Sequence, residues 1–151
     1  MEIDFMYFKY MPNTKIVNDI LQLHTSIFGE SNQLVRQMES KPDLLIHLAL
    51  AAEKVVGYKI GYMLDDEKFY SWLGGVDEKY RNLGIASKLM ENQHQYLVDH
   101  NYKKVQTKTK NQWRNMLILN IKHGFDVIGT YTNDHGEPKI ILEKKLLEEK
   151  S

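Results

Sequence analysis

Apolar residues recur at helical spacing from Asn13 or Thr14 to Gly29. The side chains that share one face of this predicted helix are Ile16, Ile20, Leu23 and Ile27. Gly29 ends the pattern, since a glycine commonly follows the last turn of a helix. Residues 3–10, which precede the helix, are predicted to form a strand.

A second, shorter helix is predicted after Gly29. Ser31 is suited to cap it, because a serine hydroxyl accepts hydrogen bonds from the free amides of a first helical turn. The apolar positions of this helix are Leu34, Val35 and Met38. It must stop before Pro42, because helical geometry is disfavoured for the residue that precedes a proline.

The middle of the chain changes to strand-like runs. Three such runs, residues 44–52, 55–64 and 68–76, are separated by short polar segments that are typical of turns. They predict an antiparallel meander. The acidic segment 65–67 is interpreted as a solvated turn at one hairpin rather than as a clamp for a substrate.

The second half of the chain adds two helices and three strands. In order, the pattern predicts a helix over 84–100, a strand over 103–109, a helix over 113–123 closed by Gly124, and hairpin strands over 125–131 and 139–146. The complete order βααβββαβαββ predicts an α+β fold with a mixed, mostly antiparallel sheet flanked by helices. A single domain over residues 1–151 is expected, because no linker or repeat interrupts the pattern.

Composition narrows the class of protein. The chain has 151 residues and a hydrophobic fraction of 42%, which suffices for the core of one domain. Its 20 basic and 20 acidic residues cancel, so neither nucleic acid nor a membrane surface is an expected partner. The absence of cysteine excludes disulfides and thiol nucleophiles and favours a cytoplasmic location. The N-terminus has neither a basic start nor a long apolar run, so no signal peptide is predicted.

The stretch from Arg81 to Ser87 carries the clearest chemical signal. Gly84 stands at the mouth of a predicted helix, with Arg81 before it and the small Ala86 after it. A helix N-terminus presents unpaired amides and a partial positive charge, and a glycine lets a phosphate approach the backbone. The stretch therefore predicts a phosphate-binding turn. A phosphate-loop nucleotide hydrolase does not fit, because the second glycine and the lysine of that motif are missing.

This stretch resembles the GNAT superfamily of N-acetyltransferases. The family motif is a strand that ends in Val, followed by Gln/Arg-x-x-Gly-x-Gly/Ala and a helix; here Val76 is followed by Arg81-Asn82-Leu83-Gly84-Ile85-Ala86. Gly124-Phe125 closes a later helix, as in the family, and the predicted element order matches the family fold along nearly the whole chain. The resemblance implies an acetyl-CoA-dependent N-acetyltransferase that moves an acetyl group to a primary amine of a small molecule or protein by direct attack on the thioester.

The resemblance also implies where acetyl-CoA binds. The pyrophosphate would be held by the turn residues Arg81, Asn82, Leu83, Gly84, Ile85, Ala86 and Ser87. The pantetheine arm would pair with the end of the fourth strand, at Leu73, Gly74, Gly75 and Val76. The two glycines are expected to form a β-bulge that bends this strand away from residues 103–109. Asn111 is expected to cap the following helix or to contact CoA, and Asn115 flanks the same position.

Both catalytic positions of the family carry other residues in this chain. Asn120 stands where many members have a tyrosine acid, and Tyr70 stands where some have a glutamate base. An amide cannot donate its proton to a thiolate but can hydrogen-bond it, and an ordinary phenol is a poor base, so Tyr70 is expected to pack or to position a water. These departures leave an alternative open, a GNAT-fold module that binds or senses an acyl-CoA with little transfer.

The acceptor site is expected at Phe28, Gly29 and Glu30, which correspond to the family segment that walls this site. His135 and Glu137 on the final hairpin are further candidates. The expected partners are acetyl-CoA and an amine acceptor, with a homodimer left open.

The remaining histidines are given structural roles. His47 lies among apolar residues of a strand and is expected to be a core histidine with its hydrogen bonds satisfied. His24 and His94 lie on helices without a partner at metal-ligand spacing, so no metal site is expected.

Overall fold

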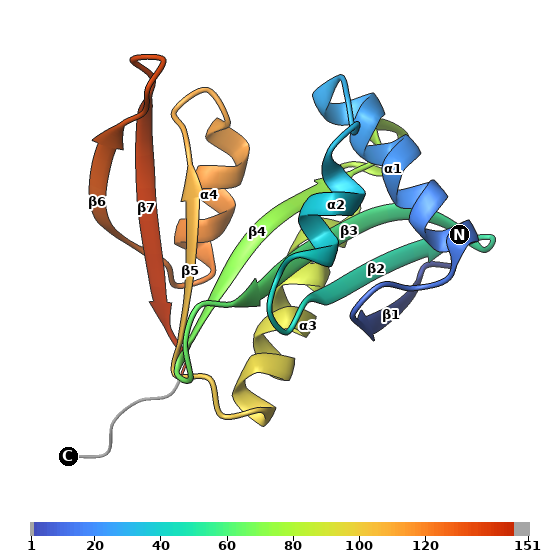
Figure 1. The fold of residues 1–151 in the computed structure, drawn as a ribbon, viewed down its shortest axis with the longest axis horizontal. Helices are drawn as coiled ribbons and strands as arrows, with labels where there is room; N and C mark the ends of the chain where they lie inside the picture. Colours follow the sequence, from blue (N-terminus) through green and yellow to red (C-terminus); the bar gives the residue numbers. More distant parts are fainter. Residues whose placement is uncertain (1, 147–151) are drawn as a thin grey trace.

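The computed structural model describes residues 2–146, which form a seven-stranded sheet with helices on both faces (Figure 1). The elements are β1 (Asp4–Lys9), α1 (Thr14–Phe28), α2 (Leu34–Glu39), β2 (Leu45–Ala51), β3 (Lys54–Met63), β4 (Lys68–Val76), η1 (Glu78–Tyr80), α3 (Ile85–Asp99), β5 (Lys104–Thr109), α4 (Arg114–Lys122), β6 (Asp126–Thr132) and β7 (Pro138–Lys145). The predicted α+β class and element order are confirmed. The short 3-10 helix η1 is an addition that the apolar pattern did not predict.

The strands are arranged in the order β1-β2-β3-β4-β5-β7-β6. Every neighbouring pair is antiparallel except β4 and β5, which are parallel and pair only from Lys68 opposite Lys104 to Ser71 opposite Thr107. Beyond this point the two strands diverge, and the sheet opens into a V (Figure 1). The predicted separation of β4 from residues 103–109 is therefore confirmed.

The bulge that accompanies this divergence lies at Trp72. Ile60 of β3 pairs with Leu73 and Gly61 pairs with Ser71, which leaves Trp72 as the extra residue of β4. The prediction of a bulge at the glycine pair 74–75 was wrong, because both glycines keep a regular register with β3.

Packing explains why Gly75 has no side chain. A Cβ atom at this position would lie 2.5 Å from Cδ1 of Ile27, on α1. Gly75 therefore allows the last turn of α1 to lie directly against β4. Gly75 thus marks a close approach between helix and sheet, which a sequence pattern does not distinguish from a bulge.

Local side-chain chemistry sets the ends of α1 but not the start of α2. The Oδ1 atom of Asn13 accepts the amide of Ile16 at 2.9 Å and caps the helix, whose start was expected at Asn13 or Thr14. Gly29 ends α1 with φ +92°, as predicted. Gln33 occupies the N-cap position of α2, so the prediction of Ser31 as its cap was wrong. The Ser31 hydroxyl instead lies 2.7 Å from the hydroxyl of Thr25 on α1 and is already engaged.

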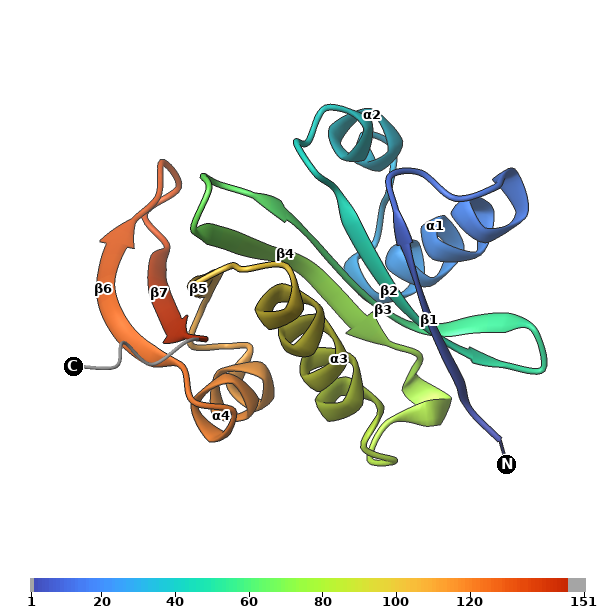
Figure 2. The ribbon, with the colours of Figure 1, turned by 90° about the horizontal axis from the view of Figure 1, so that it is seen from below.

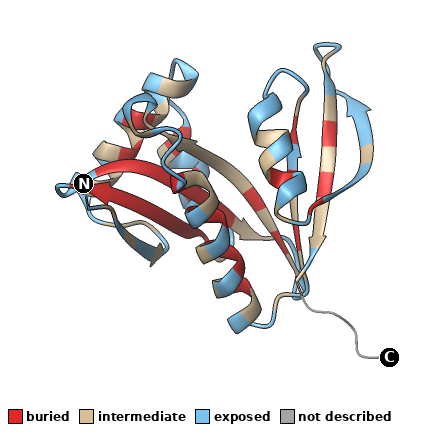
Figure 3. Ribbon diagram, turned by 180° about the vertical axis from the view of Figure 1, so that it is seen from behind, coloured by how far each residue is buried: buried red, intermediate tan, exposed pale blue. Residues whose placement is uncertain are grey.

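Helices α1 and α2 cover one face of the sheet and α3 covers the other (Figure 2). Every residue of β2 is buried between these layers, whereas β6 is mostly exposed at the sheet edge (Figure 3). On the α1 side, Ile20, Leu23, Leu34 and Met38 pack with Leu48, Tyr58 and Ile60. On the α3 side, the helix contributes Ile85, Leu89, Met90 and Leu97.

Two histidines, His47 on β2 and His94 on α3, are buried without full hydrogen bonding. His47 is 3% exposed and stacks on Tyr7, but its Nδ1 atom has no partner among residues 2–146. The expectation of a satisfied core histidine was wrong on this point. His94 receives a hydrogen bond at Nδ1 from Nζ of Lys144 at 3.0 Å, and within the described part of the chain its Nε2 atom has no partner. Burial lowers the pKa of His47 to about 4 and that of His94 to about 2.

Acid is expected to destabilise the fold through these histidines. Both stay neutral in the folded chain and titrate near pH 6.5 when unfolded, so their full stability is present above pH 6.5 and is lost as the pH falls towards 4. The loss approaches about 1.4 kcal/mol per pH unit for each histidine. Thermal melts between pH 7.5 and 5 should show a flatter decline for His47→Phe than for the unchanged protein. His135→Phe, at an exposed hairpin position, is the control, and equal slopes for all three proteins would contradict the assignment.

Candidate active site

The turn between η1 and α3 presents a row of free amides. Gly84 is the N-cap residue of α3 with φ +79°, and Asn82 is also left-handed with φ +65°. Among the described residues, no backbone N–H from Asn82 to Ser87 has a hydrogen-bond acceptor. Residues 81–84 are exposed, and the space beside Gly84 is open. Such a turn at a helix N-terminus has the geometry and the partial charge to bind an anion.

Side chains on either side hold this turn in place. The Nε atom of Arg81 donates to the carbonyl oxygen of Val76 at 3.1 Å, which ties the turn back to the end of β4. Asp77 accepts the amide of Lys79 at 2.9 Å, and its own amide donates to Val56 at 2.8 Å. The arginine side chain therefore supports the turn, while the backbone supplies the donors.

The end of β4 lies beside the turn and has one unpaired edge. Residues 73–76 pair with β3 on one side, whereas the pairing with β5 has already ended at Ser71. The structure thus brings together the two segments predicted to hold the cofactor. The outer edge of β4 carries backbone groups with which an extended amide chain can pair as an added strand.

A small cavity lies between β4 and the two helices α1 and α2. It has a volume of about 170 Å³ and is lined by His24, Glu30, Ser31, Gln33, Leu34, Gln37, Trp72 and Leu73. Of the predicted acceptor residues, Glu30 lines this cavity and Gly29 is the C-cap of α1. Phe28 packs against Trp113 instead, with ring centroids 6.0 Å apart, and so joins the end of α1 to the start of α4 across the V.

His24 is the cavity residue that sequence reasoning missed. Its Nδ1 atom lies 2.6 Å from the Tyr58 hydroxyl, and burial lowers its pKa while the nearby Glu30 carboxylate opposes this shift. The one available signal was its position four residues after Ile20, on the helix face that packs against the sheet.

Residues 15–125, which make up most of the chain, match the model of the acetyltransferase (GNAT) family. The chain belongs to the GNAT family of acetyltransferases. It is accordingly an enzyme of the acyltransferase class, and the predicted family assignment is confirmed.

Solved GNAT structures share the complete fold at low sequence identity. Ard1 from Thermoplasma volcanium is 18% identical, with a TM-score of 0.78 over 95% of this chain and 99% of that one. A GNAT family acetyltransferase from Elizabethkingia anophelis, with acetyl-CoA bound, is 22% identical, with a TM-score of 0.76 over 93% and 97%. An aminoglycoside 6'-N-acetyltransferase complexed with coenzyme A is 11% identical, with a TM-score of 0.81 over 97% and 99%. No curated protein matches the chain significantly in sequence.

The two catalytic candidates of this GNAT protein lie on opposite faces of the sheet. Tyr70 lies on the face opposite α3, 5.4 Å from the Tyr62 ring and beneath the Lys108 ammonium. Burial first, with Tyr62 and Tyr131 adding to it, raises the pKa of Tyr70 to about 12, so its phenol is not a base at neutral pH. Asn120 lies on α4, on the same side as α3, and is buried (Figure 2). Its side chain makes no hydrogen bond to any of residues 2–146.

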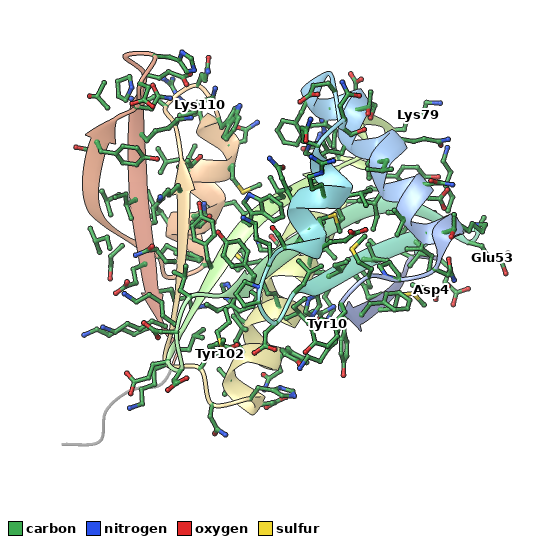
Figure 4. The ribbon with its side chains drawn as sticks, in the orientation of Figure 1. Asp4, Tyr10, Glu53, Lys79, Tyr102 and Lys110 are labelled. Atoms are coloured by element: carbon green, nitrogen blue, oxygen red, sulfur yellow. The ribbon has the colours of Figure 1, made fainter. Side chains whose placement is uncertain are left out.

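The start of α4 differs from expectation. Trp113 holds the N-cap position, so Asn111 lies outside the helix and does not cap it. Asn111 and Asn115 are both exposed on either side of Trp113. Lys110, which lies at the open end of the V (Figure 4), places its ammonium 4.5 Å from the Trp113 ring centroid.

The hairpin candidates do not reach the cavity. Glu137 accepts hydrogen bonds from Lys110 at 3.0 Å and from Asn133 at 3.2 Å, and it pairs with Lys139 at 3.4 Å. The hydrogen bond from Lys110 is the main reason that the pKa of Glu137 is lowered. His135 is exposed at the turn.

Within residues 2–146, no group of three or more histidine, aspartate or glutamate side chains is placed to hold a metal ion. Over the same range, no helix has both the length and the apolar character needed to cross a bilayer.

Proposed function

We propose that this GNAT protein transfers the acetyl group of acetyl-CoA to a primary amine by direct attack on the thioester. The observation that carries the proposal is the row of amides from Asn82 to Ser87, which have no acceptor among the described residues, begin at the exposed residues 82–84 and lie next to the unpaired edge of β4. The similar structure of a GNAT family acetyltransferase from Elizabethkingia anophelis has acetyl-CoA bound, which supports acetyl-CoA as the ligand of this chain.

Each candidate residue then has a defined task. The amides of residues 81–87 hold the pyrophosphate, and residues 73–76 pair with the pantetheine arm. Asn120 hydrogen-bonds the sulfur atom as it leaves, and Asn111 and Asn115 lie beside the CoA. Tyr70 packs at the bulge. The amine enters from the side of residues 28–30, where the cavity adjoins β4.

The energetics explain why no strong acid is required at Asn120. An alkylamine with a pKa near 10.4 costs about 4.6 kcal/mol to deprotonate at pH 7. A thiol with a pKa near 8.5 is unfavourable as a thiolate by only about 2 kcal/mol at the same pH. Removing a proton from the amine is therefore the step that needs the protein, and solvent can protonate the thiolate.

The test is turnover of acetyl-CoA with a panel of primary amines, followed through thiol release. We expect release that depends on both the amine and the protein. The second candidate function, an acyl-CoA sensor, is favoured by the raised pKa of Tyr70 and by the amide at position 120. Tight acetyl-CoA binding without release above background for any amine would support the sensor and contradict the transferase.

A further inference from the structure

The cavity beside β4 lies where an amine would meet the thioester. Its floor includes Trp72 and Leu73, the residues at which β4 bulges and has already separated from β5. Leu73 also begins the segment to which the proposed function assigns the pantetheine arm. An amine in this cavity therefore lies next to the bound acetyl group, and the inference that follows rests on the proposed function.

The size and lining of the cavity limit what can enter. A volume of about 170 Å³ corresponds to about six water molecules. Leu34 and Trp72 supply apolar surface, and Glu30 supplies a carboxylate. The cavity thus suits a small primary amine, or the aminomethyl end of a larger molecule, which Glu30 attracts as an ammonium ion.

The imidazole of His24 is held in a fixed orientation at this cavity. Its Nδ1 atom is engaged with the Tyr58 hydroxyl at 2.6 Å, and its ring packs on Phe28 with centroids 4.7 Å apart. Within the described residues, its Nε2 atom has no hydrogen-bond partner in the protein. We propose that His24 is the general base of this acetyltransferase and that its Nε2 atom takes the proton from a small primary amine bound in this cavity.

The proton balance of the step is simple. The bound ammonium ion first gives one proton to Nε2, which releases it to solvent. The neutral amine nitrogen then attacks the carbonyl carbon of the thioester, the new C–N bond forms, and one electron pair moves to the carbonyl oxygen. The nitrogen becomes cationic again, and its second proton passes to Nε2. The oxyanion then restores the C=O bond and breaks the C–S bond, and the thiolate takes the proton from the imidazolium through solvent. An ammonium ion and a thioester thereby give an amide, a thiol and one proton in solvent.

Burial disfavours the imidazolium that this step creates, and the Glu30 carboxylate partly offsets this penalty. The titratable groups that face it are Tyr58 from β3 and Glu30 from the loop between α1 and α2. Tyr58 is buried and its pKa is raised, so its hydroxyl stays protonated; its oxygen accepts the bond when Nδ1 carries the proton, and its hydroxyl donates when Nδ1 does not. Base action requires the tautomer with the proton on Nδ1, and the imidazolium keeps the same bond.

At neutral pH the imidazole is uncharged, so its Nε2 atom is available to accept a proton. Burial lowers the pKa of His24 from its ordinary value, and the Glu30 carboxylate limits the shift. The rate should therefore fall on the acid side of neutrality as Nε2 becomes protonated. Removing the carboxylate should move this acid limb to lower pH, because the imidazolium loses its counter-charge.

The experiment compares three variants with the unchanged protein, using short primary alkylamines as acceptors. His24→Gln should lower kcat about 100-fold or more and abolish the acid limb of the pH–rate profile, with acetyl-CoA affinity unchanged. Glu30→Gln should keep the acid limb but shift it to lower pH and raise KM for the amine. His100→Gln, which alters an exposed histidine at the end of α3, should leave rate and profile unchanged.

The outcomes separate this inference from the proposed function. Turnover by the unchanged protein together with an unaltered rate and acid limb in His24→Gln would overturn the inference and leave the transferase intact. Failure of the unchanged protein to release thiol with any amine would overturn both. If His24→Gln does not fold, the pH–rate profile of Glu30→Gln still tests the inference. An acid limb at the same pH as in the unchanged protein would contradict His24 as the base, because the Glu30 carboxylate should affect its pKa.

Discussion

Gly84→Glu is expected to abolish acetyl-CoA binding while the fold is kept. The space beside Gly84 is open, so the side chain fits, and the left-handed backbone at φ +79° adds a cost of about 1 to 2 kcal/mol. The new carboxylate lies among the amides proposed to hold the pyrophosphate. Two like charges about 4 Å apart near a protein surface repel by about 4 kcal/mol. The dissociation constant for acetyl-CoA should rise at least roughly 100-fold, as measured by calorimetric titration.

Gly136→Glu is the matched control for this change. Gly136 has φ +77° and open space around it, so the substitution brings the same backbone strain and the same charge. It lies in the turn between β6 and β7, outside the proposed pyrophosphate site. Its acetyl-CoA affinity should equal that of the unchanged protein. Acetyl-CoA binding by the Gly84→Glu variant with unchanged affinity would contradict the assignment of residues 81–87 as the cofactor site.

Gly61→Ala is expected to cause the largest loss of stability. A Cβ atom at this position of β3 would collide with the backbone oxygen of Tyr70 and the ring of Phe69 on β4. The backbone oxygen cannot move away without disturbing the pairing of β3 and β4 beside the bulge. Overpacking of this kind costs about 1 to 3 kcal/mol and sometimes more. At roughly 2 to 4 °C per kcal/mol for a chain of this size, the melting temperature should fall by roughly 2 to 12 °C.

The control is Gly129→Ala on β6. This glycine also lies in a strand beside a register shift, but an added Cβ would have no heavy atom within 4 Å. Its stability should change by less than about 0.5 kcal/mol. Calorimetric melts of the two variants would contradict the packing argument if they coincided.

The candidate site was predictable in part, because part of it is built from neighbours in the chain. The turn at Gly84 combines a glycine, a helix start and a preceding strand within a few residues, so its free amides follow from local geometry. The cavity was not predictable in the same way. Its residues come from α1, α2, the loop between them and β4, and the contact of His24 with Tyr58 joins positions 34 residues apart.

Sequence alone determined the element order, the Gly29 stop and the turn at Gly84, because each depends on periodicity, hydrogen bonds or backbone angles within short stretches of the chain. Tertiary structure decided the bulge at Trp72, the packing role of Gly75, the hydroxyl contact that removes Ser31 from the α2 cap, and the unpaired Nδ1 of His47. Each of these is set by the element packed against the residue. A local sequence pattern does not specify which residue, distant in the chain, will pack against a given side chain.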